Sequence, residues 1–416
     1  MATANTFQFV DWVAAESLRM LLNKLVYCQF ATHKYEKEYE REFAVGETVR
    51  VKLPQRWLVT NGLAFQPQPI NRIYTTVVVN QIFGIHFQVD SIERALKMER
   101  GREWFKEEYI DKLMAKLANE IDRRFALFAM QNTSNIVGQL GVDPASMTTF
   151  MQARQRLIEQ GCPQGEEWGM IYPPSVGTSL IPALASFFNP TSEISRQYKN
   201  GSMGKMSGFD WYESVNNWRQ TAGTWAGAVT VNGANQQGSQ LAITATAGDT
   251  FNQGDIVSIA SVFAVNPENL AVVNALQNKE FVVTSPLTAL GAGNAADVLN
   301  ISPAIFGPGS QYQNVDSLPA SGAALTLFPG TTAPNGKTSA QGLALTRDAF
   351  AMVGVPLEIP KACEWSSRAT DPDTGISIAL LEMFDPIERK KVTRADVLMG
   401  FGSLYPDNAA CRIACS

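Results

Sequence analysis

The chain has 416 residues, 45% of them hydrophobic and 18% charged, so it can bury a large core and form two to three domains of about 150 residues. This composition excludes a disordered, a collagen-like and a low-complexity chain. The 34 basic and 39 acidic residues leave a net charge of -5, which argues against a tight, sequence-independent grip on nucleic acid through a basic face.

Targeting signals and cysteine motifs are weak throughout the sequence. No secretory pattern occupies the first 30 residues, and no apolar run approaches the roughly 18 residues that span a bilayer. The five cysteines are odd in number and form no CxxC pair, which indicates reduced thiols. We therefore expect a chain that stays in the cytoplasm, without a membrane partner, a disulfide framework or a zinc site.

The start of the chain predicts an amphipathic helix over residues 9–28. Its apolar residues recur at helical spacing: Val10, Val13, Leu18, Leu21, Leu22 and Leu25. Two interpretations are equally open at this point, a core helix of its own domain or an arm that docks on another chain.

A basic hairpin with a wide tip is predicted next. Residues alternate from Glu47 to Leu53, and a second β-rich run extends from Ile73 to Val79. A two-stranded ribbon is marginal alone in water, so it either folds back on its own domain or lies over a neighbouring subunit. The second interpretation makes its basic and aromatic residues candidate intersubunit contacts: Arg50, Lys52, Arg56, Trp57, Arg72 and Tyr74.

A long spine helix is predicted from about Arg102 to Gln131. Half of residues 91–124 are charged, and an apolar stripe recurs beneath them at helical spacing: Phe105, Leu113, Leu117, Ile121, Phe125 and Phe128. At ~1.5 Å per residue such a helix is roughly 45 Å long, which suits a spine on which other elements pack. Its exposed charges are interpreted mainly as solvation.

An α/β segment over residues 146–215 is followed by a change in composition. Residues 221–340 hold only eight charged side chains: Asp249, Asp255, Glu268, Lys279, Glu280, Asp297, Asp316 and Lys337. Six strand candidates between turns predict an all-β barrel or sandwich there: Gly227–Val231, Leu241–Ala247, Asp255–Val262, Phe281–Thr284, Val298–Ile301 and Ala323–Leu327. We expect the α/β character to resume from Leu343, which makes the β unit an insertion into a parent domain.

No set of residues in the sequence predicts catalysis, a metal or a cofactor. The only histidines, His33 and His86, lack companions at metal-ligand or triad spacing, and both are interpreted as structural, His86 as a packed imidazole. We therefore predict a protein that is not an enzyme.

Five short stretches carry a resemblance to a known family: Phe83–Asp90, Gly208–Asp210, Val229–Ala234, Gly254–Ala260 and Cys411–Ala414. In this order and spacing they resemble the major capsid proteins of tailed phages with the Hong Kong 97 fold. More narrowly they resemble the coat proteins of short-tailed Salmonella-type phages, which carry an inserted β domain. The fold expected from this resemblance is an α+β capsid fold with a spine helix, an extended loop and an inserted Ig-like or barrel domain.

The resemblance also implies roles for regions. It implies an N-terminal arm at 1–44, an extended loop at 45–88, a peripheral domain with the spine helix at 89–140, axial-domain parts at 141–220 and 341–385, the inserted domain at 221–340, and C-terminal strands at 386–416. Relatives carry a long charged loop after the first strand of the insertion, whereas Asn232–Gln240 is short and uncharged here, so salt bridges from that loop are in doubt.

The implied function is self-assembly, as hexamers and pentamers, into an icosahedral shell around double-stranded DNA. The implied partners are a portal protein and a separate scaffolding protein, since nothing before the first helix resembles a fused scaffolding segment. Asp11 and Glu16 are candidate scaffold contacts. Two alternatives stay open: an encapsulin-like nanocompartment shell, and an enzyme or glycan-binding protein whose Trp211, Trp218 and Trp225 line a sugar site.

Overall fold

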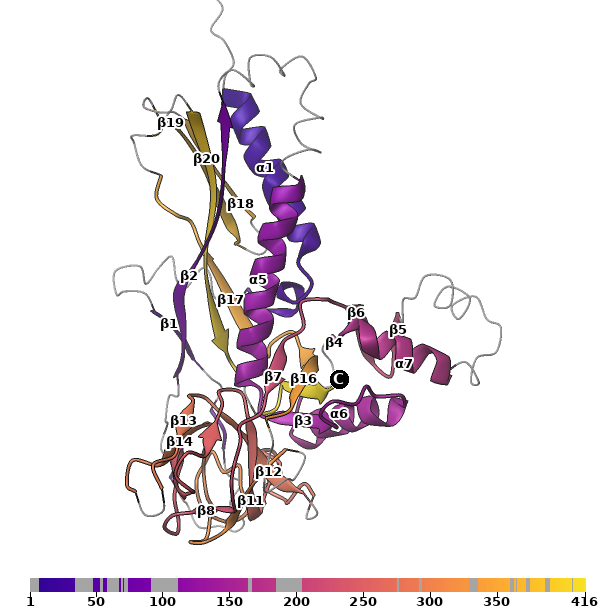
Figure 1. Cartoon of the computed structure of the whole chain (residues 1–416), viewed down its shortest axis with the longest axis vertical. Coiled ribbons are helices and arrows are strands. Elements are labelled where there is room, and N and C mark those ends of the chain that lie inside the picture. The colour runs from indigo at the N-terminus through magenta and orange to yellow at the C-terminus, as the bar shows by residue number, and fades with distance from the viewer. Residues whose placement is uncertain are drawn as a thin grey trace, which may run out of the picture. The chain divides into compact units, whose positions relative to one another are not determined.

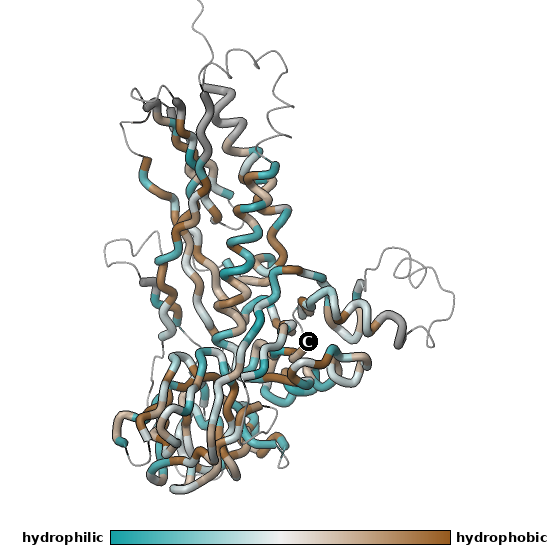
Figure 2. Tube along the Cα trace, in the orientation of Figure 1, coloured by the Kyte–Doolittle hydropathy of each residue, from teal (hydrophilic) through white to brown (hydrophobic). Residues whose placement is uncertain are grey.

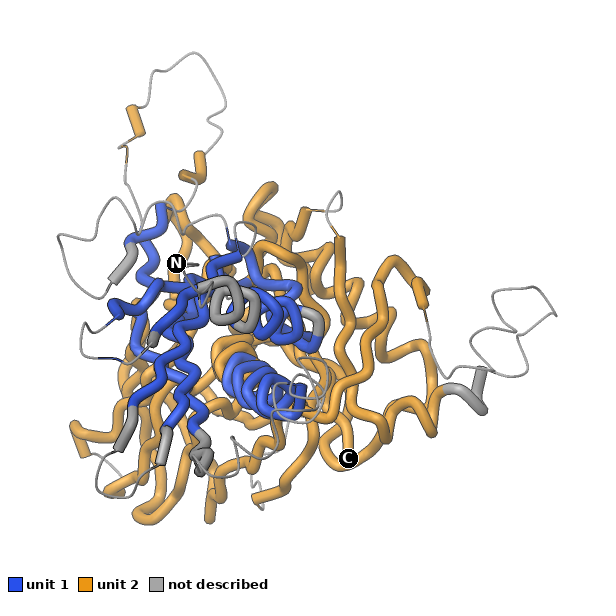
Figure 3. Tube along the Cα trace, turned by 90° about the horizontal axis from the view of Figure 1, so that it is seen from above, with its two compact units in different colours: residues 1–52, 74–125, 350–402 blue, residues 53–73, 126–349, 403–416 orange. Residues whose placement is uncertain are grey.

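The fold is described from a computed structural model, which divides into two compact units (Figure 3). Unit 1 comprises residues 1–52, 74–125 and 350–402, and unit 2 comprises residues 53–73, 126–349 and 403–416. The structure describes residues 7–33, 48–52, 55–57, 67, 68, 70, 74–90, 111–163, 167–184, 204–274, 277–291, 294–328, 336–359, 363, 365–371, 375–385, 390–405 and 407–416.

Unit 1 is built on an antiparallel sheet with the strand order β1-β2-β20-β19-β18, and β17 also pairs with β20 (Figure 1). Its longest strands, β2 and β20, pair in a register that sets Phe83 opposite Val397. Both of these side chains are buried, which places them on the covered face of the sheet. The strands are β1 (Thr48–Lys52), β2 (Tyr74–Asp90), β17 (Phe350–Val355), β18 (Trp365–Thr370), β19 (Ser377–Asp385) and β20 (Lys390–Ser403).

The described residues of this unit include the helices α1 (Phe7–Lys24) and the first part of α5 (Asp111–Asn132). The α1 helix contacts β18 and β19 and buries an apolar stripe of Ala14, Leu18, Leu21 and Leu25. The prediction of an amphipathic helix is confirmed, and its described apolar side chains pack within the chain as in a core helix. A short 3-10 helix, η1 (Cys28–Phe30), follows.

The predicted spine helix is confirmed from Asp111 onward, and its expected start at Arg102 lies outside the described residues. Along α5 hydrophobic and hydrophilic positions alternate, and Leu117, Ile121 and Phe125 are buried (Figure 2). The Phe125 ring meets Phe350 and Phe401 edge to face, with ring centroids 6.0 and 5.3 Å apart. These contacts anchor the helix to the sheet of unit 1.

The body of unit 2 is a mixed sheet with the order β3-β21-β16-β4-β6-β5, in which β7 also pairs with β16. β21 lies between β3, with which it runs parallel, and β16, with which it runs antiparallel. Helices α6 (Met147–Glu159) and α7 (Pro174–Leu184) contribute Phe150, Leu157 and Leu180 to a core with this sheet. The strands are β3 (Asn135–Gly138), β4 (Trp168–Tyr172), β5 (Lys205–Met206), β6 (Phe209–Glu213), β7 (Arg219–Thr221), β16 (Thr338–Thr346) and β21 (Ala410–Ala414).

The low-charge region forms a closed barrel in the order β11-β12-β14-β9-β8-β15 around its own apolar core. All six predicted strands are confirmed as the six barrel strands, with ends displaced by a few residues: β8 (Val229–Val231), β9 (Gly238–Thr244), β11 (Ile256–Phe263), β12 (Asn278–Val283), β14 (Val298–Ile305) and β15 (Ala324–Leu327). β10 (Thr250–Phe251) pairs with β13 (Leu287–Thr288) beside it. The chain enters and leaves the barrel through paired strands, with Thr221 opposite Thr338.

The expectation that α/β character resumes from Leu343 is wrong. The residues described after the barrel form strands only, β16 to β21, and their apolar runs form no helix. The reason is that a short apolar run has no periodicity that separates a buried strand from a buried helix. Over all the ranges that the structure describes, none of the helices has both the length and the apolar character that crossing a membrane requires.

Candidate functional site

The base of the hairpin has one buried face and one exposed face. In the β1–β2 register Lys52 lies opposite Tyr74, and Arg50 lies two positions along the same face. Both basic residues are exposed, and 43% of the surface of Tyr74 is exposed to solvent. On the opposite face, Val51 and Val77 are fully buried within the chain. The structure therefore brings three of the six predicted contact residues together on one accessible surface.

The other three predicted contact residues lie in the tip of the hairpin, which belongs to unit 2. Trp57 is 60% exposed. The backbone carbonyl of Arg56 accepts a hydrogen bond from the side chain of Gln311. Arg72 lies outside the described residues.

The two candidate scaffold contacts both lie on α1. Glu16 forms an ion pair with Arg19, one turn further along, and only 13% of the Glu16 side chain is exposed. The side chain of Asp11 lies outside the described ones. An acid already paired within its own helix presents less charge to a partner than the sequence suggested.

A second candidate site is the junction between the barrel and the body of unit 2, where buried charges meet. The barrel contributes Asp255, Lys279 and Glu280, which are 2%, 4% and 6% exposed. The body contributes Arg412, Asp407 and Arg156. Each barrel charge thus faces a body charge of opposite sign, which is an electrostatically complementary contact.

Arg412, on β21, is the most deeply buried of these charges. Its Nη1 donates to the carbonyl oxygen of Gly254 at 2.9 Å and to Oε1 of Gln341 at 3.1 Å. Burial lowers the pKa of Arg412 to about 10, and the nearby carboxylates of Asp255 and Glu280 oppose that effect. The guanidinium therefore stays charged at neutral pH.

Asp255 follows Gly254 in the turn before β11. Its two carboxylate oxygens accept from the side chain of Gln220 at 3.0 Å and from the backbone N–H groups of Gly223 and Asn252 at 2.9 and 2.8 Å. Burial raises the pKa of this carboxyl, against the lowering effect of the three donors and of Arg412. The carboxylate holds the turn in shape.

Glu280, on β12, is held from two sides of the body. The guanidinium of Arg156 donates to both of its oxygens, at 3.1 and 3.3 Å, and the N–H of Ile136 donates at 3.0 Å. Burial is the largest influence on its pKa and raises it. Next to it, Lys279 Nζ lies 3.2 Å from Oδ1 of Asp407.

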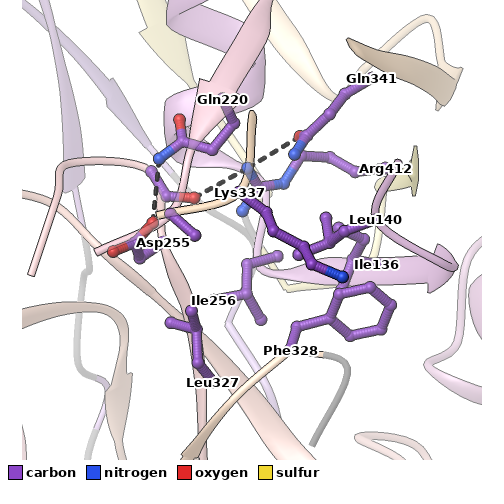
Figure 4. A pocket seen from close by; sticks show the side chains of 12 residues that line it. Ile136, Leu140, Gln220, Asp255, Ile256, Leu327, Phe328, Lys337, Gln341 and Arg412 are labelled. Carbon is purple, nitrogen blue, oxygen red and sulfur yellow. Dashed lines mark hydrogen bonds between the residues drawn. The ribbon is translucent and has the colours of Figure 1, made fainter. Parts of the chain in front are cut away.

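A small cavity of about 20 Å³ lies beside Arg412 (Figure 4). Its lining includes the side chains of Asp255, Lys337 and Gln341. This volume is room for about one water molecule. Within the described residues, Nε and Nη2 of Arg412 have no hydrogen-bond partner.

Three further carboxylates of the insertion hold the backbone of turns. Asp249 accepts from the N–H groups of Ala226 and Thr246, and Asp297 accepts from those of Leu290 and Gly291. Asp316 accepts from the N–H of Phe263 at 2.7 Å. Most of the few charges that the sequence retains in this region therefore serve either turns or the junction.

The tryptophans considered for a sugar site do not form one. Trp211 and Trp225 are 6% and 4% exposed, and they pack in two separate cores, against Phe150 and Phe251 respectively. Trp218 is partly buried, and its Nε1 donates to Gln220. The interpretation of His86 as a packed imidazole is also wrong, because it lies on the exposed side of β2.

Four of the five thiols are buried: Cys28, Cys162, Cys411 and Cys415. Burial raises the pKa of Cys411 and of Cys415 to about 12, and it also raises that of Cys28. All five cysteines are free, as the sequence predicted. Among the described residues no three metal-ligating side chains gather at one place.

The junction between the barrel and the body was not predicted from the sequence. One signal for it existed, because Arg412 is the single charged residue in an otherwise apolar strand, and such a residue is buried only with partners. Its partners could not be inferred, since the Gly254 carbonyl lies 158 positions away in the chain.

The comparisons with known proteins concern sequence and structure separately. Residues 88–413 match the family described as P22 coat protein, gene protein 5. None of the curated proteins compared with the chain matches it significantly.

Among solved structures, the chain is similar to that of Mycobacterium phage Che8, with 12% identity, a TM-score of 0.47, and coverage of 94% of this chain and 90% of that one. It is also similar to the capsid of Ralstonia phage GP4, with 10% identity, a TM-score of 0.40, and coverage of 89% and 84%. The capsid of the Helicobacter pylori bacteriophage KHP30 gives 12% identity, a TM-score of 0.41, and coverage of 89% and 84%. The family assignment rests on the sequence match alone.

These observations define a structural protein of a virus particle, a tailed-phage capsid subunit that is not an enzyme. The chain belongs to the P22 coat protein family, and it forms the capsid shell of the virion by association with copies of itself. The encapsulin-like and sugar-binding alternatives are thereby set aside.

Proposed function

We propose that the chain adopts the Hong Kong 97 capsid fold and assembles as hexamers and pentamers into an icosahedral procapsid that later encloses double-stranded DNA. The exposed basic face of the hairpin base carries this proposal, because its opposite face is already buried within the chain. A ribbon with one buried and one accessible face can lie between two subunits, which suits the extended loop of residues 45–88. The other regional roles, from the arm at 1–44 to the C-terminal strands at 386–416, follow from the same fold.

The partners beyond other copies of the chain are part of this proposal. A separate scaffolding protein directs assembly, a portal protein occupies one vertex, and the packaged DNA is contacted weakly and without sequence preference. The net charge of -5 supports a weak contact with DNA, because a tight one needs a concentration of basic residues.

The loop after the first barrel strand makes no charged contact between capsomers in this proposal. The segment between β8 and β9 is closed on itself by Gln236, whose side chain donates to the carbonyls of Asn232 and Ala242 and accepts from the N–H of Ala242. A compact, uncharged turn cannot supply salt bridges, so we infer that other surfaces join the capsomers.

The test of the hairpin assignment combines a deletion with point variants. Deletion of residues 54–72 should leave a folded protein that forms no particles, and Arg50→Gln with Lys52→Gln should lower particle yield. Because the two side chains are exposed, the monomer's free energy of unfolding should change by less than about 0.5 kcal/mol. Sedimentation and negative-stain electron microscopy measure the particles.

Arg219→Gln is the matched control for the point variants. It removes an exposed basic residue from β7, outside the hairpin, and should leave particle yield unchanged. Normal particles from the deletion would refute the assignment of the extended loop.

A further inference from the structure

The place of Arg412 in β21 couples the barrel to the body. Cys411 and Ile413 point into the core shared with α6, whereas Arg412, between them, points to the other side of the sheet. There it is fully buried and reaches the carbonyl of Gly254, in the turn that begins β11 of the barrel. One side chain of β21, in the sheet of the body, therefore fixes a backbone atom of the barrel.

The acceptor of this hydrogen bond has a conformation that few residues can adopt. Gly254 has a φ of 90°, and a Cβ built on it would lie 2.7 Å from Oε1 of Gln220. The N–H of Gly254 donates to the carbonyl of Val283 on β12 at 2.8 Å, so the turn is also tied to the barrel wall. The contact with Arg412 is thus made to a rigid point of the barrel.

Stability alone does not account for a charge at this place. Two of the guanidinium's nitrogen donors, Nε and Nη2, have no partner among the described residues, and burial of a cation is costly even when it is paired. An apolar side chain of similar volume would fill the space without that cost. What the arginine adds is a donor of fixed direction, because Nη1 of its planar guanidinium holds the carbonyl of Gly254 and Oε1 of Gln341 at the same time.

The barrel needs such a fixed point because its covalent connections lie side by side. The chain enters through β7 and leaves through β16, and these strands are paired with each other. A single pair of adjacent strands does not by itself fix the orientation of the barrel about the connection. The contacts of Arg412, Glu280 and Lys279 provide the additional attachments that define one orientation.

We propose that Arg412 is the positioning residue that sets the barrel on the body in the single orientation required for uniform shells. The proposal rests on the shell-forming function proposed above, since a closed assembly requires every copy to present its surfaces in the same way. Arg412 acts through the Gly254 turn and does not itself contact another subunit.

The test compares Arg412→Met and Arg412→Lys with the wild-type full chain. Hydrogen exchange of the unassembled chain should show that the Arg412→Met variant loses protection at residues 252–255 and at Val283 by about tenfold, which corresponds to about 1.4 kcal/mol. Amides of β8 and β9, on the barrel strands away from the turn, should keep their protection. Electron microscopy of assembled particles should show open or irregular shells for Arg412→Met and a partial recovery of uniform shells for Arg412→Lys, which keeps a charged donor but loses the rigid, planar guanidinium that fixes its direction.

Ile413→Val is the matched control, because it weakens the same strand on its other face without touching the barrel. Uniform shells and unchanged exchange in Arg412→Met would overturn the proposal, as would equally irregular shells from an Ile413→Val chain of the same stability. If Arg412→Met does not fold, hydrogen exchange and electron microscopy of Arg412→Lys test the proposal instead. Failure of the wild-type chain to form shells would refute the proposed function, whereas the exchange measurement on the unassembled chain would still decide the role of Arg412.

Discussion

At the residue scale, Asp122 shows how one buried carboxylate ties two segments of unit 1 together. Its oxygens accept from the backbone N–H groups of Val26 and Cys28, at 2.6 and 3.3 Å, in the segment that follows α1. It lies on α5 and is 1% exposed. Burial raises its pKa, and the hydrogen bonds from the backbone lower it less. The carboxylate therefore connects the end of α1 to the spine helix.

The pKa of Asp122 predicts a pH dependence of stability. A carboxyl whose pKa is higher in the folded than in the unfolded chain adds stability at low pH, and this contribution is lost as pH rises through the folded pKa. Asp122→Asn should cost about 1–3 kcal/mol at neutral pH, because its amide places a donor against a backbone N–H. The deficit should grow as pH falls from neutral through the raised pKa of the folded chain, and urea unfolding at several pH values measures it.

Glu120→Gln is the control for this pH dependence. Glu120 is 41% exposed, and hydrogen bonds from Arg123 lower its pKa to about 2, so it stays ionised across the same window. Its replacement should change stability by a pH-independent amount between pH 5 and 7. A constant deficit for Asp122→Asn over that range would contradict the assignment of a raised pKa.

At the scale of elements, the barrel is the part of the fold that the sequence predicted best. Alternation is clearest in β14, where every second residue from Leu299 to Ile305 is buried. Such a period of two is a local signal, and turns of Gly, Asn and Pro separate the strands. The base of the hairpin was predicted for the same reason.

Long-range pairings could not be predicted in this way. The parallel pairing of β21 with β3 joins segments that lie far apart in the chain, and no local period encodes it. The junction was missed for the same reason. The sequence assigned no role to Asp255, Lys279 and Glu280, and only the fold places Arg412, Asp407 and Arg156 opposite them. Local periodicity thus identifies elements, and tertiary contacts decide what their charged residues do.

The barrel should also fold when it is separated from the body. A fragment of residues 221–340 retains the closed strand order and the whole apolar core, so it should show a cooperative thermal transition and dispersed amide signals. In the fragment Glu280 loses Arg156 and Ile136 and becomes hydrated, so Glu280→Gln should change its stability by less than about 0.5 kcal/mol.

In the full chain the same substitution leaves Arg156 without its carboxylate. Breaking a buried ion pair on one side costs about 3–5 kcal/mol, so the effect of Glu280→Gln should be several times larger there. Equal effects in the fragment and in the full chain would contradict the buried junction, and a disordered fragment would show that the barrel is not autonomous.

At the scale of the whole molecule, the proposed contact between α1 and a scaffolding protein is a charge contact that must later be released. An exposed ion pair contributes roughly 0.2–1 kcal/mol and is screened by salt, which suits a scaffold that leaves when DNA enters. We expect scaffold-assisted assembly to weaken as salt rises, and Asp11→Asn with Glu16→Gln to impair it while monomer stability stays nearly unchanged. Because Glu16 is already paired with Arg19, the single Glu16→Gln variant should impair assembly less than the double variant does.

The control for this prediction removes an acid elsewhere. Glu167 is 68% exposed and pairs with Arg347 at 3.6 Å, so Glu167→Gln removes one exposed carboxylate without altering α1. Light scattering at low and high salt measures the rate of assembly. Wild-type rates for the double variant at both salt concentrations would show that the scaffold binds elsewhere.

The buried cysteines give the molecule a built-in set of chemical reporters. Only a thiolate reacts readily with alkylating reagents, so thiols whose pKa burial raises to about 12 are silent while the fold is closed. Cys28 follows α1, Cys162 follows α6, and Cys411 lies in β21. Because these three lie in different elements, the order in which they become reactive during denaturation traces which part of the subunit opens first, without any engineered label.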